Sequence, residues 1–125
     1  IDVKTFTGRN YADVNWSAVS DNNTSQTGML YRIFRSLDGI SFSLRASQTG
    51  TVNYADLTAN DSAVPNSPVL NAVSNPTSSS LDVSWNAAAD NGILYYYKLE
   101  TIDSLGNDAN SAIDSNAVVS GVKQY

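Results

Sequence analysis

The side chains of this sequence that could take part in chemistry are mostly carboxylates. The chain of 125 residues contains 12 Asp and Glu residues, but no His and no Cys. It therefore lacks the commonest general base, the thiol nucleophile and the usual transition-metal ligands. We expect no catalytic residue and no enzyme activity.

Calcium is the cation that these carboxylates could bind, because it takes roughly six to eight oxygen ligands and Asp-rich loops supply them. The candidate ligands are Asp61, Asp90, Asp103 and Asp108. Their spacing does not match an EF-hand loop. Asp and Asn are also favoured in turns, where their side chains accept hydrogen bonds from the backbone. The turn interpretation is favoured over a calcium site, and no other cofactor is expected.

Three consecutive tyrosines could form a surface on which a sugar ring stacks. Tyr95, Tyr96 and Tyr97 lie in residues 93–102, the most β-prone segment of the chain. Alternate side chains of a strand point to opposite faces, so Tyr95 and Tyr97 are expected in the core and Tyr96 outside it. Tyr96 is therefore the candidate ligand-binding residue. A single exposed ring makes a poor stacking platform, which favours a structural role for this run.

A repeated tryptophan segment indicates how the chain is organised. Residues 11–22 recur as residues 80–91 at an offset of 69 residues, with the pattern Asp-Val-x-Trp in both copies. A fixed offset shared by several residue types indicates a repeated structural unit. We expect Trp16 and Trp85 to occupy equivalent positions inside stacked antiparallel sheets.

Period-2 alternation and turn residues predict an all-β chain with about nine strands and no substantial helix. The expected strands cover residues 1–8, 11–18, 29–36, 41–46, 51–57, 69–73, 81–85, 93–102 and 117–125. Residues 58–68 are expected to be a linker, because Pro65 and Pro68 cannot donate ladder hydrogen bonds. Residues 103–116 are expected to be a long polar loop.

The composition favours an exported protein with an acidic surface. With 42% hydrophobic and 15% charged residues, the chain can bury a core. Its net charge of −5 would repel phosphate backbones, so nucleic acid is not an expected partner. No apolar run approaches the ~20 residues of a membrane span, so membrane insertion is not expected either. Scarce Lys and Glu together with the lack of Cys suggest an extracellular or cell-surface location in a bacterium.

The strand residues resemble the fibronectin type III family, in its bacterial secreted and cell-wall variants. Residues 13–18 and 30–39 are similar to the B strand, C strand and C–C′ turn of that family, and residues 81–85 repeat its B strand. Residues 95–107 and 115–119 look like its F strand, F–G loop and G strand. The resemblance implies an antiparallel, immunoglobulin-like β-sandwich. It says little about function, because this fold serves as spacer, adhesive surface and binding module alike.

The order of these signatures leaves two domain arrangements open. In a tandem pair, residues 1–63 form a fibronectin III-like unit with strands A, B, C, C′ and E, and residues 64–125 form a second, incomplete unit. In the alternative, residues 1–125 form one enlarged sandwich with residues 64–91 as an inserted hairpin. The equal spacing of the two Trp segments favours the tandem pair, whereas the order of the strand signatures favours the single sandwich.

The expected function is that of a non-catalytic structural or adhesive module, excised from a longer bacterial extracellular or surface-anchored protein. It would act as a spacer or as a protein-interaction surface. The alternative is a carbohydrate- or ligand-binding accessory module of a secreted enzyme. Because incomplete sandwiches expose strand edges, the expected partners are neighbouring domains or copies of the parent protein, joined by edge-strand pairing. A surface protein or a glycan is a further expected ligand.

Overall fold

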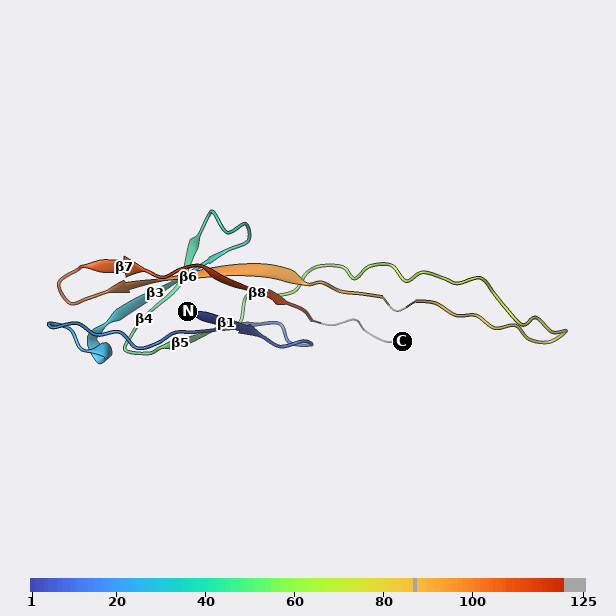
Figure 1. The fold of residues 1–125 in the computed structure, drawn as a ribbon, viewed down its shortest axis with the longest axis horizontal. Coiled ribbons are helices and arrows are strands. Elements are labelled where there is room, and N and C mark those ends of the chain that lie inside the picture. The colour runs from blue at the N-terminus through green and yellow to red at the C-terminus, as the bar shows by residue number, and fades with distance from the viewer. Residues whose placement is uncertain (87, 121–125) are drawn as a thin grey trace.

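Two antiparallel sheets form the body of the molecule (Figure 1). The computed structural model describes residues 1–86 and 88–120. Its strands are β1 (Asp2–Thr5), β2 (Ala12–Asn15), β3 (Leu30–Ser36), β4 (Ser43–Thr49), β5 (Asn53–Asp56), β6 (Ile93–Ile102), β7 (Asp108–Asn110) and β8 (Asp114–Val118). One sheet has the order β1-β2-β5, and the other has the order β4-β3-β6, with β7 and β8 both paired to β6. A single 3-10 turn, η1 (Gln26–Gly28), precedes β3.

The all-β expectation is confirmed, but the count of nine strands is wrong, because these residues contain eight. The predicted strands at residues 69–73 and 81–85 contain only isolated bridges. Conversely, the predicted loop at residues 103–116 contains β7 and most of β8. Those two strands are rich in Asp and Asn, which have low β-propensity, and it is their pairing with β6 that makes them strands.

The core lies between the two sheets and is built from alternating inward-facing side chains. The buried apolar residues are Val3, Ala12, Val14, Trp16, Met29, Tyr31, Ile33, Ala59, Tyr95, Tyr97, Leu99 and Val118. The expected burial of Tyr95, Tyr97 and Leu99 along β6 is confirmed. Trp16 follows β2 directly, and its ring centroid lies 5.3 Å from that of Tyr31 on the opposite sheet.

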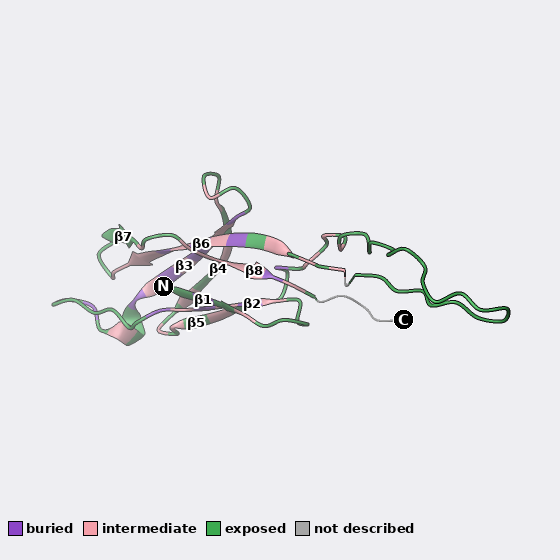
Figure 2. Ribbon diagram, turned by 45° about the vertical axis from the view of Figure 1, so that its right-hand side comes forward, coloured by how far each residue is buried: buried purple, intermediate pink, exposed green. Residues whose placement is uncertain are grey.

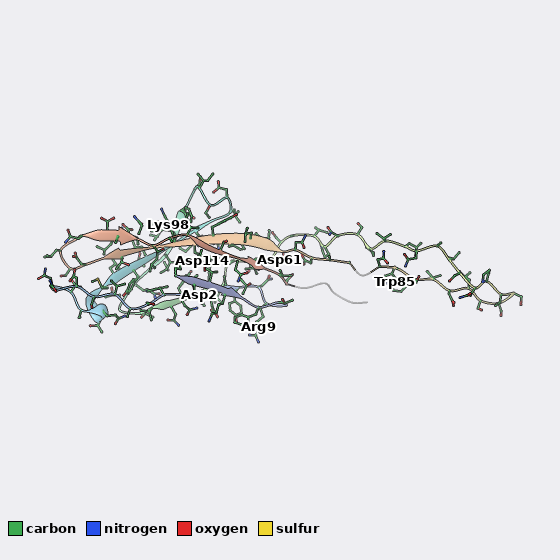
Figure 3. All side chains as sticks on the ribbon, viewed as in Figure 1. Asp2, Arg9, Asp61, Trp85, Lys98 and Asp114 are labelled. Atoms are coloured by element: carbon green, nitrogen blue, oxygen red, sulfur yellow. The ribbon has the colours of Figure 1, made fainter. Side chains whose placement is uncertain are left out.

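Trp85 does not share the environment of Trp16. Its exposed fraction is 65%, against 8% for Trp16. Figure 3 shows Trp85 on a segment that projects away from the sandwich. The prediction that both indoles occupy equivalent core positions is therefore wrong. The repeated pattern specifies an alternating segment, but within the described residues no second sheet covers the copy that contains Trp85.

The β3–β6 ladder joins the two halves of the chain. The two strands pair continuously from Leu30 with Ile102 to Ser36 with Tyr96. Strands from before residue 63 and after residue 92 therefore share one sheet, while residues 64–86 and 88–91 lie outside both sheets. This is the pairing that the single-sandwich alternative describes, and the domain boundaries themselves stay a prediction.

Side chains close the seam between the two sheets where β1 lies beside β8. Asp114 Oδ2 accepts a hydrogen bond from the Val3 N–H at 2.8 Å, and Asn116 Nδ2 donates to the Val3 carbonyl at 3.2 Å. Farther along, the Gly8 N–H donates to the Val119 carbonyl at 2.8 Å. These bonds satisfy backbone groups that an edge strand would otherwise expose to pairing with other chains.

A buried ion pair ties the two sheets together. Asp56, at the end of β5, is fully buried, and its Oδ2 accepts hydrogen bonds from Arg35 Nη1 and Tyr97 Oη, both at 2.9 Å. Its Oδ1 accepts from the Thr58 N–H at 3.1 Å and the Thr58 hydroxyl at 2.7 Å. Burial raises the pKa of Asp56, but the hydrogen bonds from Thr58, Tyr97 and Arg35 outweigh it, so the net pKa lies below the ordinary value. The ionised carboxylate thus links β5 to both β3 and β6.

Asp56→Asn is expected to lower the free energy of unfolding by about 3 kcal/mol, because it leaves the Arg35 charge without its counter-ion. Urea denaturation followed by circular dichroism measures the change. The control is Asp2→Asn, which removes a solvent-exposed carboxylate 3.6 Å from Lys4 Nζ and should cost less than about 0.5 kcal/mol. Equal costs for the two variants would contradict the structural role of the ion pair.

Stability is expected to fall as the pH drops below about 4. The pKa of Asp56 in the folded chain lies below the ordinary Asp value of 3.8, which applies to the unfolded chain. The Ser41 and Ile40 N–H groups likewise lower the pKa of Asp38 from 3.8 to about 2. The unfolded chain therefore binds more protons in acid. The stabilisation is present in full above the unfolded-state pKa and is lost as the pH falls through the folded-state values.

Unfolding free energies measured between about pH 2 and pH 7 test this dependence. The acid slope should be shallower in Asp56→Asn than in the unmodified chain. A slope that the substitution leaves unchanged would show that Asp56 does not contribute to it.

Candidate functional site

A long hairpin arm projects from the sandwich between β5 and β6 (Figure 1). We define the arm as residues 64–86 and 88–91. Its limbs are joined by backbone hydrogen bonds from Asn66 to Ala89 (2.8 Å), Asn71 to Ser84 (3.0 Å), Asn86 to Val69 (2.8 Å), Ser74 to Asp82 (3.1 Å), Asp82 to Ser74 (2.8 Å) and Thr77 to Ser80 (2.7 Å). Figure 2 shows that the arm is exposed along nearly its whole length. A ribbon of two limbs without a covering layer is only marginally stable in water.

One face of the arm is apolar. Leu70 is the antiparallel bridge partner of Trp85, so the two side chains lie on the same face. Side chains alternate along an extended segment, which places Val83 and Leu81 on that face too. We call Leu70, Leu81, Val83 and Trp85 the arm face. Their exposed fractions are 67%, 52%, 51% and 65%, so each is at least half exposed in the described structure.

The opposite side of the arm carries the polar side chains together with Val69, which alternation from Leu70 places there and which is 59% exposed. There the Asn71 amide donates to Ser84 Oγ at 3.2 Å, and the Asn75 amide donates to Asp82 Oδ2 at 2.8 Å. In the sequence of residues 64–91, the charged residues are Asp82 and Asp90. The side that carries Leu70 and Trp85 therefore has no charge of its own.

The root of the arm is hydrogen-bonded to the sandwich. Tyr95 Oη, near the start of β6, donates to the Asn60 carbonyl at 2.7 Å. Asp61 Oδ2 accepts from the Ser120 N–H at 2.9 Å and the Ser120 hydroxyl at 3.0 Å, and the Ser120 N–H lowers the pKa of Asp61. Gly92 begins the return into the sandwich at φ +68°, where a Cβ would collide with the backbone of β8. Both limbs are therefore held where they leave the sandwich.

The calcium candidates lie at two separate places. Asp61 and Asp90 lie at the root of the arm, whereas Asp103 and Asp108 lie around the turn from β6 to β7. The Asp103 carboxylate accepts hydrogen bonds from the side chain and N–H of Asn107, which lower its pKa. Within residues 1–86 and 88–120, no group of three or more His, Cys, Asp or Glu residues is placed to hold a metal ion. Calcium binding by these residues stays a prediction.

Tyr96, the candidate ligand-binding residue, is half-buried on the outer face of β6. A Cβ built on Gly39 would lie 3.3 Å from the Tyr96 ring, so the ring packs against the turn between β3 and β4. Beside it, Lys98 Nζ lies 4.9 Å from the ring centroid of Phe42 and 5.4 Å from that of Phe34. These rings pack against Lys98 and the turn, and ligand binding at Tyr96 stays a prediction.

A cleft of about 460 Å³ opens near Trp16, and sequence analysis did not predict it. The lining combines apolar side chains such as Trp16 and Leu99 with polar ones such as Asp103 and Ser111. Beside it, Ser111 interrupts the pairing of β6: its N–H donates to the Leu99 carbonyl at 2.8 Å, and its Oγ accepts from the Leu99 N–H at 2.9 Å. The buried Trp16 Nε1 has no hydrogen-bond partner among the described residues. No local pattern reveals this cleft, because its residues come from segments that are far apart in the sequence.

No protein-family model, curated protein or solved structure matches this chain. Across residues 1–86 and 88–120, none of the helical structure is long and apolar enough to cross a membrane. The assignment of a functional surface therefore depends on the geometry of the arm and of the cleft.

The two tryptophans are expected to contribute very differently to stability. Trp16→Ala should lower the free energy of unfolding by about 3–5 kcal/mol, because it leaves a cavity beside Tyr31. Trp85→Ala should change it by less than about 0.5 kcal/mol, since the side chain is mostly exposed. Urea denaturation followed by circular dichroism measures both variants. Similar costs at the two positions would mean that the arm unfolds as part of the core.

Proposed function

We propose that this protein is a non-catalytic protein-interaction module that binds through the arm face. The observation that carries the proposal is the exposure of Leu70, Leu81, Val83 and Trp85 on one side of a ribbon. These side chains expose roughly 400 Å² in total, the size at which a patch on a monomer is often functional. Binding of a partner that covers these side chains would be favoured by the hydrophobic free energy of removing them from water.

The distribution of ionisable groups supports a non-catalytic role. The sequence has no His or Cys to serve as a base or nucleophile. The buried carboxylate, Asp56, already accepts hydrogen bonds from Arg35, Tyr97 and Thr58. Asp38 and Asp103 accept backbone hydrogen bonds within their own turns.

The proposal includes a fibronectin III-like identity for the sandwich. In this assignment β1, β2 and β5 are strands A, B and E, and β4, β3 and β6 are strands C′, C and F. β7 and β8 together are an interrupted G strand. The Tyr95 hydroxyl supports the assignment, because a Tyr near the start of strand F that bonds to upstream backbone is a feature of immunoglobulin-like sandwiches. The arm would then be an enlarged connection between strands E and F.

In this proposal the module belongs to a bacterial extracellular or surface-anchored protein, where it would space or adhere. Its partners would be neighbouring domains, copies of the parent protein or another surface protein. Ligand or carbohydrate binding is the second candidate function, and the cleft beside Trp16 supports it, since it combines an indole with carboxylates. Saturable quenching of Trp16 fluorescence by a sugar, measured in the Trp85→Ser variant, would favour this second function.

Trp85→Ser is expected to reduce binding to partners at least tenfold, on the order of what removal of a central aromatic anchor costs. The measurement uses the immobilised chain as bait for proteins from the extracellular fraction of the producing cells, with retained protein quantified. Leu105→Ser is the matched control, because Leu105 is 68% exposed but lies in the turn between β6 and β7. Equal retention by the unmodified chain and both variants would contradict a function of the arm face.

A further inference from the structure

We infer that the arm face binds the arm face of a second copy of this chain, so that two arms pack face to face in a weak symmetric dimer. This inference rests on the proposed function and names the partner of that same surface. The pairing is isologous, since each copy offers the same apolar side chains to the other. It differs from edge-strand pairing, because contact is made by side chains and not by backbone hydrogen bonds.

The first half of the chain shows how a surface of this kind is covered. Val14 is fully buried and Trp16 is 8% exposed, because the sheet containing β3 and β6 lies over them. At the offset of 69 residues, their counterparts are Val83 and Trp85. Both counterparts are at least half exposed. The arm face therefore has the residue pattern of a sheet surface that packs under an apolar layer, and the described residues supply no such layer.

The sandwich of another copy exposes apolar side chains such as Leu44, Leu94 and Ile40, but they lie on separate elements and not on one ribbon. Its inward faces are already packed against each other around Tyr31, Ile33 and Tyr97. Its outer face carries Lys98 and the pair formed by Arg32 and Glu100, whose charged atoms lie 3.7 Å apart. Packing an apolar ribbon there would take these charges out of water. The matching apolar ribbon is the arm of the second copy.

The charge distribution permits this contact although the whole chain repels itself. A net charge of −5 opposes self-association in general. On the arm, however, Asp82 lies on the polar side, where Asn75 donates to it at 2.8 Å, and Asp90 lies at the root. Two arm faces can therefore meet without bringing carboxylates together.

The size of the surface predicts a weak dimer. The arm projects beyond the sandwich in both views, so two arms can overlap while the sandwiches stay apart (Figures 1 and 2). Face-to-face packing would bury roughly 800 Å² of arm-face side chains, the range of weak and transient interfaces. Two ribbons stacked about 10 Å apart would form a small four-stranded sandwich, which stabilises both arms.

Sedimentation velocity of the full chain between about 5 µM and about 500 µM tests the inference, since a weak interface has its dissociation constant in this range. The expected result is a concentration-dependent shift from monomer to dimer. Trp85→Ser and Val83→Ser should each weaken dimerisation at least about tenfold. Leu105→Ser, the control used above, should leave it unchanged.

Tryptophan fluorescence gives a second readout that reports on the arm. Trp16 is buried inside the sandwich, so its emission should not depend on protein concentration. Trp85 is 65% exposed, so its emission should shift to shorter wavelength as dimers form. The shift should follow the same concentration dependence as sedimentation and should be absent in Val83→Ser.

Each outcome is decisive. A chain that remains monomeric over the whole range overturns the self-association. If Trp85→Ser nevertheless loses retention in the bait experiment, the arm face binds a different protein, and only the present inference fails. Dimers that persist in both arm-face variants would place the contact elsewhere and would also overturn it.

Discussion

The ion pair between Arg35 and Asp56 is the interaction on which the sandwich depends most directly. Each partner and the Tyr97 hydroxyl come from a different strand, so the contact forms only when β3, β5 and β6 are all in place. Burying a carboxylate is costly, and here hydrogen bonds to both of its oxygens offset the cost. β5 precedes the arm and β6 follows it. The contact between Asp56 and Tyr97 therefore joins the two strands between which the arm extends. Loop-closure entropy rises slowly with length, so a long arm is compatible with a closed sandwich.

Alternation in the sequence correctly predicted which side chains of a strand face the core. The predictions failed for segments whose structure depends on pairing or packing with distant parts of the chain. Alternation correctly placed Trp16, Tyr95, Tyr97 and Leu99 in the core. The same pattern was misleading at Trp85, because alternation indicates which side chains share a face but not what lies over that face. β7 and β8 were missed for the opposite reason, since their Asp- and Asn-rich segments gain structure only from pairing with β6.

The candidate site was predictable in its parts but not as a surface. Residues 64–91 contain all three prolines and only two charged residues, which could have indicated an exposed, uncharged segment outside the sheets. The arm face itself depends on the register that sets Leu70 opposite Trp85, and two isolated segments do not encode that register. The candidate calcium ligands, by contrast, were predicted from single residues without knowledge of their surroundings. Asp61 and Asp103 were identified by residue type, and in the structure their carboxylates accept hydrogen bonds from nearby backbone groups.

The seam between β1 and β8 has a mechanical consequence. Val3 is joined across it by the side chains of Asp114 and Asn116, whereas backbone ladders bind the strands within each sheet. A tensile load on the N-terminal strand would therefore break these side-chain hydrogen bonds, a short ladder to β2 and the packing of Val3 before it reached the contacts of Asp56. The strand could peel away and extend the molecule while Asp56 still held the remaining strands together. A module that spaces or adheres under shear would gain length in this way before it unfolds.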